Sequence, residues 1–334
     1  MGGAKMDDPF TPDLADFILE TMDEWKLAGI SIAVVDGDDT FTKGFGHATL
    51  PDTPATPETL SYGGSTTKAF TTAALAHLIE SGKYPALSKG WQTPVSSIIR
   101  DDFVTGDEWA TNKLSLEDLA SHRSGLTNND MSIRLEENGK PWTVRDITRN
   151  IRNFPLRAQP RTEFDYNNEG YAVLSHVIEK VTGKWLGDVL KEIIWEPLGM
   201  NSTFLDLQQA KDAPEHVSTG YYWDENNKRH QEVLFCLPGL SVVLVQSSPM
   251  SSTIRNGSDA FFVRNPQYRQ KFTRTSGDHG LSITQTLQVD WTFPYMDYLG
   301  GVPRLREPLF TGILDRLLHM VPSSIGFPTW IMEL

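Results

Sequence analysis

The 334-residue chain has a single cysteine, Cys236, and therefore cannot form a disulfide within itself. Nothing in the sequence requires an oxidising compartment, and we interpret Cys236 as a small buried apolar residue. The first residues carry no apolar stretch of the signal-peptide kind, and no run approaches the ~20 apolar residues that a spanning helix needs. From these absences we expect a cytoplasmic protein without a membrane partner.

Positive charge is also scarce, because 43 acidic side chains face 30 basic ones and the formal charge is -13. No run of Lys or Arg offsets this balance, which argues against nucleic acid as a partner. The eight histidines show no paired metal-ligand spacing, so His122 and His176 are predicted to be packed or surface side chains. We expect neither a metal nor a cofactor. The Gly-x-Ser-x-Gly motif of α/β-hydrolases is missing as well.

The N-terminal third has the periodicity of a helix followed by a hairpin. Apolar residues recur at helical spacing over residues 12–27, after a Thr-Pro start that suits a helix N-terminus. Residues 30–35 and 40–46 read as strands around the turn at 36–39, and residues 51–58 read as a loop. Further helices are predicted over residues 65–82, 116–120, 171–183 and 185–195, the last stopping at Pro197.

The last hundred residues have weaker patterns. Residues 242–245 form a short apolar run, and residues 283–293 alternate apolar with polar side chains as a half-buried strand does. We take residues 283–293 as the best candidate to complete a sheet that begins with the N-terminal hairpin.

Ser65-Thr66-Thr67-Lys68 is the first motif that carries chemistry. A hydroxyl is a weak nucleophile until a base takes its proton, and the Ser-x-x-Lys spacing puts both side chains on one helix face. Lys68 must be neutral part of the time to act as that base, which requires burial to lower its pKa. Taken alone, the same four residues also suit a helix-capping serine with a surface lysine.

Tyr166-Asn167-Asn168 is the second motif. A tyrosine phenol near the serine can relay a proton to a leaving group, and an asparagine amide can hold a substrate carbonyl and orient the lysine. By itself this motif also fits a packed loop tyrosine beside an Asn turn. Its weight comes from occurring together with Ser65 and Lys68 in one chain.

With both motifs in this order, the chain resembles the serine β-lactamase and penicillin-binding protein family, particularly its class C branch with related esterases, D-aminopeptidases and fungal acyltransferases. The blocks that carry the resemblance lie at residues 24–46, 61–82, 114–126 and 155–200. The resemblance implies Ser65 as the nucleophile, Lys68 and Tyr166 as the acid/base pair, and Asn168 as a substrate contact. Whether the lysine or the tyrosine takes the first proton stays open.

The sequence departs from the family pattern in two places. The family's third motif, Lys/His-x-Gly on an inner strand, is not found, since residues 278–280 lack the spacing and residues 310–312 lack the cation. That motif supplies one of two oxyanion-hole amides, and losing such a donor costs roughly 100- to 1000-fold in rate. In addition, Arg161 stands where the family usually has a glycine before the tyrosine block.

The resemblance implies an α/β fold of the α+β type, with a mainly antiparallel sheet flanked by helices and a helical insertion that carries Tyr166. We expect a β-lactamase-related region over residues 1–231 and a divergent segment over residues 232–334, where an altered reading frame is one hypothesis. The expected activity is hydrolysis of a small-molecule ester or amide: a β-lactam, an ester or a D-amino-acid peptide. Alternatives are an acyltransferase using the same acyl-enzyme and a non-catalytic homologue; the oligomeric state is undetermined.

Overall fold

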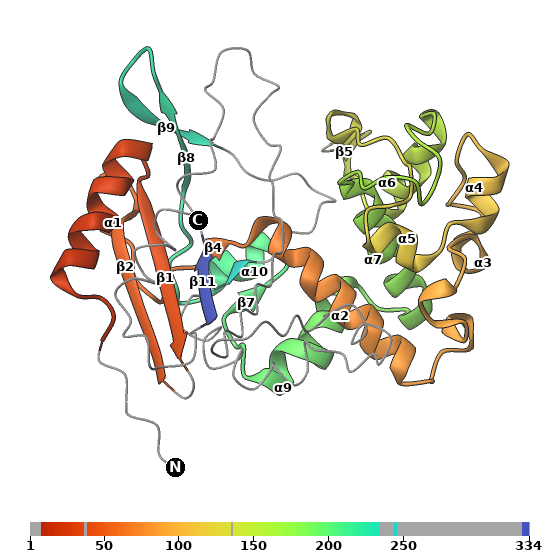
Figure 1. The fold of residues 1–334 in the computed structure, drawn as a ribbon, viewed down its shortest axis with the longest axis horizontal. Helices are drawn as coiled ribbons and strands as arrows, with labels where there is room; N and C mark the ends of the chain where they lie inside the picture. Colours follow the sequence, from red (N-terminus) through yellow and green to blue (C-terminus); the bar gives the residue numbers. More distant parts are fainter. Residues whose placement is uncertain (1–7, 37–38, 135, 234–243, 246–328, 334) are drawn as a thin grey trace, which may run out of the picture. The chain divides into compact units, whose positions relative to one another are not determined.

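The computed structural model describes residues 8–36, 39–134, 136–233, 244–245 and 329–333. All of these described residues fall in one unit of the fold. Its architecture is the mixed arrangement of helices and antiparallel strands that the sequence predicts (Figure 1). None of the helices in these ranges is both long and apolar enough to cross a membrane.

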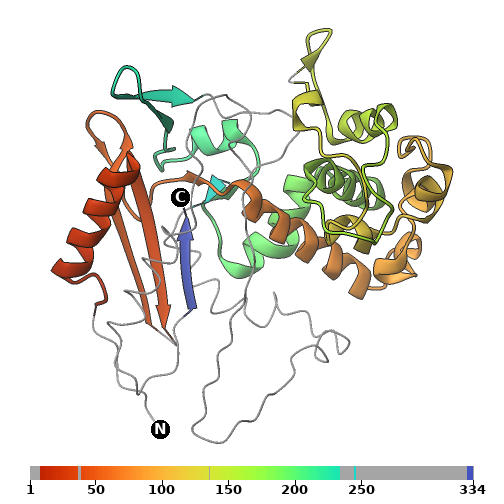
Figure 2. The same ribbon diagram turned by 45° about the horizontal axis from the view of Figure 1, so that its top comes forward.

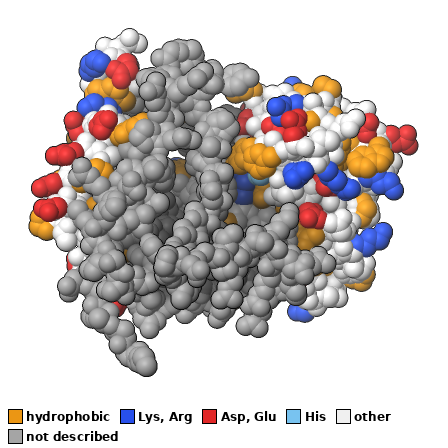
Figure 3. Space-filling view, in the orientation of Figure 1, with side chains coloured by type: hydrophobic (Ala, Val, Ile, Leu, Met, Phe, Trp, Pro, Cys, Tyr) orange, Lys and Arg blue, Asp and Glu red, His pale blue; other side chains and the backbone are white. Residues whose placement is uncertain are grey.

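Helix α1, Pro12–Trp25, opens the fold and confirms the predicted N-terminal helix. The Thr11 hydroxyl accepts the Leu14 N–H, and the helix ends at Lys26 in a left-handed conformation. One face buries apolar side chains, among them Leu14 and Ile18, and the helix lies beside the strands that follow it in the chain (Figure 1). The opposite face is acidic and exposed, which Figure 3 shows as red side chains along this helix. The amphipathic pattern therefore decides which side of α1 covers the sheet.

The main sheet has four antiparallel strands in the order β11-β1-β2-β3. Their bounds are β1 Gly29–Asp36, β2 Asp39–Thr49, β3 Thr53–Pro54 and β11 Thr329–Glu333. The β1–β2 hairpin confirms the predicted one, and β3 lies inside the stretch predicted as a loop. The neighbour of β1 on its other side is β11, which the sequence patterns did not single out (Figure 2). The predicted strand at 283–293 falls outside the described residues.

Within the part of the chain that the structure describes, short strands form three smaller sheets. The three-stranded one has the order β4-β10-β7, and two hairpins pair β5 with β6 and β8 with β9. Their bounds are β4 Ser61–Tyr62, β5 Glu136–Glu137, β6 Lys140–Pro141, β7 Thr203–Phe204, β8 Gly220–Asp224, β9 Arg229–Val233 and β10 Leu244–Val245. Of the strand predicted at residues 242–245, the structure describes residues 244–245, and these form β10. Because β4 leads straight into Ser65, this small sheet fixes the approach to the site.

Helices α2, α5 and α7 share one apolar core, while α6 and α10 also contribute to smaller clusters around Ile147 and Ala210. The bounds of the helices are α2 Thr67–Glu80, α3 Ser96–Ile99, α4 Glu108–Lys113, α5 Leu116–Ala120, α6 Val144–Asn150, α7 Asn168–Thr182, α8 Leu186–Leu190, α9 Glu196–Leu198 and α10 Leu207–Asp212. The largest fully buried side chains of this core include Phe103, Leu119 and Leu174. Gly183 ends α7 in the left-handed conformation, as the sequence predicts.

The helix predicted to stop at Pro197 continues one residue further, to Leu198. Helix α8 continues through a π-helical turn, Lys191–Trp195, into α9, and the chain leaves the helix only at Gly199. Pro197 stands in the last turn of this continuous stretch, directly after the π-helical turn. Because proline has no N–H, it donates no helical hydrogen bond at this position, and the chain leaves the helix two residues later.

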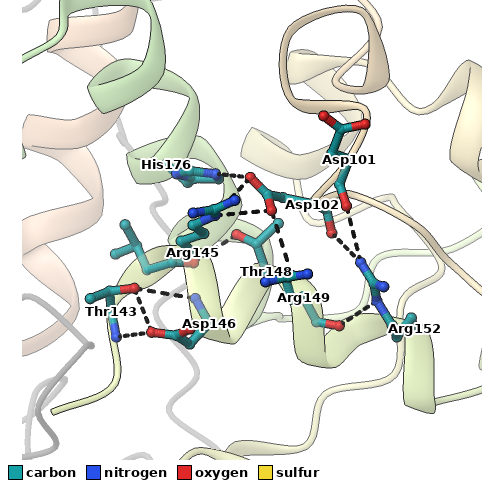
Figure 4. Close-up of polar contacts among 10 residues, drawn as sticks. Asp101, Asp102, Thr143, Arg145, Asp146, Thr148, Arg149, Arg152 and His176 are labelled. Carbon is teal, nitrogen blue, oxygen red and sulfur yellow. Dashed lines mark hydrogen bonds and ion pairs between the residues drawn. The ribbon is translucent and has the colours of Figure 1, made fainter. Parts of the chain in front are cut away.

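Asp102 ties three parts of the helical region together (Figure 4). It follows α3, and its buried carboxylate contacts His176 Nε2 of α7 at 3.0 Å and Arg145 Nε of α6 at 3.0 Å. Arg149 Nε lies 3.6 Å away. Burial alone would raise the pKa of the Asp102 carboxyl, but the hydrogen bonds from His176 and Arg145 outweigh it and hold that pKa below its usual value.

Replacing Asp102 by alanine is expected to lower the unfolding free energy by about 3 kcal/mol, because His176 and Arg145 lose a buried partner. A lowered carboxyl pKa stabilises the fold above the unfolded pKa, so the difference should shrink as the pH falls below ~4. Urea unfolding at pH 7 and pH 3 measures both values. The exposed neighbour Asp101, replaced by alanine, is the matched control and should change stability by less than ~0.5 kcal/mol. An equal loss in both variants would contradict the structural role of Asp102.

Candidate active site

Ser65 lies in a tight turn between strand β4 and helix α2. Gly64 before it has a φ of +50°, a conformation that glycine adopts without strain. The sequence predicts that Ser65 begins the helix. In the structure Gly64–Thr66 form a 3₁₀ turn, and Ser65 therefore precedes α2. The Thr66 and Thr67 hydroxyls donate to Gly63 O at 2.6 Å and Gly64 O at 2.7 Å. These bonds fix the turn that presents the half-buried serine.

Three predicted side chains meet at the Ser65 hydroxyl. Lys68 Nζ donates to Ser65 Oγ at 3.0 Å, and the Tyr166 hydroxyl lies 2.5 Å from the same oxygen. Tyr166 comes from the segment before α7, about a hundred residues further along the chain. The structure thus brings an amine and a phenol within hydrogen-bonding reach of the Ser65 hydroxyl, which is the geometry that the two motifs predict.

Lys68 is a buried lysine, with only 9% of its surface exposed. Its Nζ donates to Asn168 Oδ1 at 2.7 Å and lies 4.8 Å and 5.4 Å from the ring centroids of Tyr166 and Tyr171. Burial lowers the pKa of Lys68 to about 8, against an opposing effect of the negative charge on Asp130. A tenth or so of this amine is therefore neutral at pH 7, and half of it at pH 8.

His122 supports the Tyr166 side of the site. Its ring lies 4.6 Å from that of Tyr166, and its Nδ1 accepts the Asn167 N–H at 3.0 Å. Burial, and secondarily the charge of Lys68, lower the pKa of His122 to about 4, so its ring is neutral at pH 7. His122 is thus a packed, hydrogen-bonded histidine. The prediction from the sequence is confirmed, but its contact with Tyr166 was missed.

Asn167 and Asn168 stand at the start of α7 and have different roles. The Asn167 side chain caps the helix by accepting the Gly170 N–H at 2.6 Å. Asn168 is therefore the residue that faces the site, where it binds Lys68 and also Asp130. Asp130 was missed by sequence reasoning. No motif marks it, and only the fold brings its loop to Asn168.

Arg161, which departs from the family pattern, adopts a φ of +69° in the left-handed region that favours glycine. Its side chain makes two hydrogen bonds of 2.8 Å to the buried carboxylate of Asp118, which caps helix α5 with Ser115. A bidentate pair of this kind offsets the conformational cost of a non-glycine residue. The chain before Tyr166 therefore accommodates arginine at the position where the family usually has glycine.

No group of three or more His, Cys, Asp or Glu side chains within the described ranges is arranged to hold a metal ion. The two triplets considered for the third motif, residues 278–280 and 310–312, lie outside those ranges, as does Cys236.

Comparison with known proteins gives one consistent result. The family model described as Beta-lactamase matches residues 14–239. An unguisins hydrolase from Aspergillus campestris is 43% identical over 72% of this chain and 43% of its own length, and one from Aspergillus violaceofuscus is 42% identical over 66% and 39%. The chain thus spans less than half the length of these two relatives.

Solved structures agree on the fold. The octameric penicillin-binding protein homologue from Pyrococcus abyssi has a TM-score of 0.61 at 28% identity, covering 73% of this chain and 55% of that one. A class C β-lactamase from Rhodobacter sphaeroides has a TM-score of 0.57 at 21% identity, covering 73% and 64%.

Proposed function

The chain belongs to the beta-lactamase family, and from that premise we propose that it is a serine hydrolase that forms an acyl-enzyme on Ser65. The observation that carries the proposal is the pair of contacts from Ser65 Oγ to the Lys68 amine and the Tyr166 phenol. An activated serine needs a base within hydrogen-bonding reach and a second group that returns the proton. The Lys68 amine and the Tyr166 phenol both lie within that reach of Ser65 Oγ.

In the first step the neutral Lys68 amine takes the proton of Ser65 as Oγ attacks the carbonyl carbon of an ester or amide. The carbonyl π electrons move to oxygen and give a tetrahedral intermediate. The pKa of about 8 supports Lys68 as this base, because the amine is then neutral often enough near neutral pH. Asn168 Oδ1 holds the amine in place through the 2.7 Å hydrogen bond.

In the second step the oxyanion re-forms the carbonyl and the bond to the leaving group breaks. Tyr166 protonates the departing oxygen or nitrogen through its hydroxyl, and the phenolate that remains takes its proton back from the Lys68 ammonium, whose Nζ lies 4.8 Å from the centroid of the Tyr166 ring. Water then attacks the acyl-enzyme with the same groups acting in reverse order, which releases a carboxylic acid and restores Ser65. No electron donor or acceptor is needed.

The substrate proposal comes from the relatives. Two proteins named unguisins hydrolases share 43% and 42% identity with this chain, so unguisins are the first natural compounds to test. We place p-nitrophenyl esters and a penicillin beside them as general acylating substrates. Turnover of any of these, monitored by product release, supports the hydrolase. Failure of all three to acylate or turn over would favour a non-catalytic homologue.

The pH dependence of acylation follows from the role of Lys68. Since the neutral amine is the base, the rate is expected to rise with pH, to reach half its plateau near pH 8, and to fall about tenfold for each unit below that. Stopped-flow acylation with a non-ionising ester between pH 5.5 and 9.5 measures this profile. A rate that instead falls between pH 7 and 9 would mean that the charged ammonium is required and that Lys68 is not the base.

A further inference from the structure

Asn168 is hydrogen-bonded at both ends of its amide group. Its Oδ1 accepts from Lys68 Nζ at 2.7 Å, and its Nδ2 donates to both carboxylate oxygens of Asp130 at 3.0 Å each. A carboxylate only accepts hydrogen bonds, so the nitrogen must face Asp130 and the oxygen must face Lys68. Asp130 thereby selects one of the two orientations of the amide, namely the one that Lys68 needs.

Asp130 is held in place by contacts on both sides of it in the chain. The Asn129 N–H donates to Glu169 Oε1 of α7 at 2.8 Å, and Asn150 Nδ2 of α6 donates to Ser132 Oγ at 2.9 Å. Asp130–Ser132 form a 3₁₀ turn between these two anchors. The carboxylate is therefore fixed against the helix that carries Asn168 instead of being free to swing into solvent.

The negative charge of Asp130 also acts on Lys68. It favours the ammonium form and so opposes the effect of burial on the Lys68 pKa. Glu169 lies beside it with a buried carboxyl whose pKa is raised to about 7, first by burial and in part by Asp130. The polar and titratable groups with an interaction to Lys68 are Ser65, His122, Asp130, Tyr166, Asn168 and Tyr171.

We propose that Asp130 is a positioning residue for the base of this site: it orients Asn168 through two hydrogen bonds, and its negative charge favours the charged form of the Lys68 amine that Asn168 holds. The inference rests on the proposed roles of Ser65 and Lys68. Asp130 contacts Asn168 and acts on the lysine through it, which separates its role from those of the three residues around the Ser65 hydroxyl.

Two variants separate the charge of Asp130 from its hydrogen bonds. Asp130→Asn removes the charge but keeps an oxygen that accepts from Asn168, so the acylation profile of Ser65 should move to lower pH by about one unit with a plateau within about tenfold of wild type. Asp130→Ala also removes the acceptor, and its plateau should fall about 100-fold. Asp146→Asn, which changes a helix cap elsewhere in the same region, is the control and should leave the profile unmoved.

An equal loss of rate at every pH, with the midpoint unchanged in both Asp130 variants, would overturn the inference, since a purely structural residue acts in that way. A second readout does not depend on turnover. In protein with ¹³Cε-labelled lysine, the Lys68 signal, assigned by its absence in Lys68→Met, should titrate about one unit lower in Asp130→Asn. An unchanged NMR midpoint overturns the inference even if Ser65 is acylated. A shifted midpoint supports the inference even if the chain turns over no substrate. The absence of turnover would contradict only the proposed function.

Discussion

Ser65→Ala is expected to lower the hydrolysis of p-nitrophenyl esters by about 10⁴-fold or more, because no other hydroxyl takes the place of the nucleophile. The change removes one oxygen from a half-buried side chain, so the thermal unfolding temperature should stay within a few degrees of wild type. Steady-state rates together with thermal unfolding measure both effects.

The matched control is Ser97→Ala, which removes an exposed hydroxyl that donates to Pro94 O. It should retain full activity. Ser65→Ala with more than a tenth of the wild-type rate would exclude Ser65 as the nucleophile, whatever the control does.

Lys68→Met is expected to lower the acylation rate by about 10³-fold, within the range of ~10² to 10⁴ that a positioned base contributes. Methionine keeps most of the volume of the side chain and removes a charge that is costly to bury, but it leaves Asn168 Oδ1 without its donor, so stability should fall by no more than about 1–3 kcal/mol. Acylation in single-turnover experiments, with urea unfolding beside it, checks both expectations.

Lys68→Arg sharpens this test. Arginine keeps the positive charge but does not lose its proton at ordinary pH, so it cannot serve as a base. We expect it to be as slow as Lys68→Met at every pH. An arginine variant that keeps the wild-type rate would show that the site needs a cation at this position, and the assignment of Lys68 as the base would fail.

The parts of the fold that were predictable have strong local signals. Helix α1 has a proline start and an apolar stripe, and the β1–β2 hairpin has β-branched strands around a turn. Helix α7 has a capping asparagine at one end and Gly183 at the other. In each case the residues that decide the element lie within it, so a single sequence suffices.

Other features depend on contacts between distant segments. Strand β11 is identified only by its pairing with β1, some three hundred residues away in the chain. Asp130 has no motif, and its significance comes from the fold that brings its carboxylate to Asn168. The 3₁₀ turn at Ser65 and the π-helical turn before α9 alter the local path of the chain without changing the residue pattern. Pattern reasoning could not supply these features.

The sequence predicts which residues form the site, but it does not predict the pKa of Lys68. The two motifs identify Ser65, Lys68 and Tyr166, and the structure brings them together. The lowered pKa of Lys68 depends on how deeply the fold buries it and on the opposing charge of Asp130. Neither quantity can be read from the spacing of residues.

The most direct measurement of the central claim is where a fluorophosphonate attaches to the chain. A serine activated by Lys68 and Tyr166 predicts one adduct per chain, located by mass spectrometry in the tryptic peptide of residues 44–68 and assigned by fragmentation to Ser65. An adduct at a different side chain, or labelling that persists undiminished in Ser65→Ala, would contradict the account.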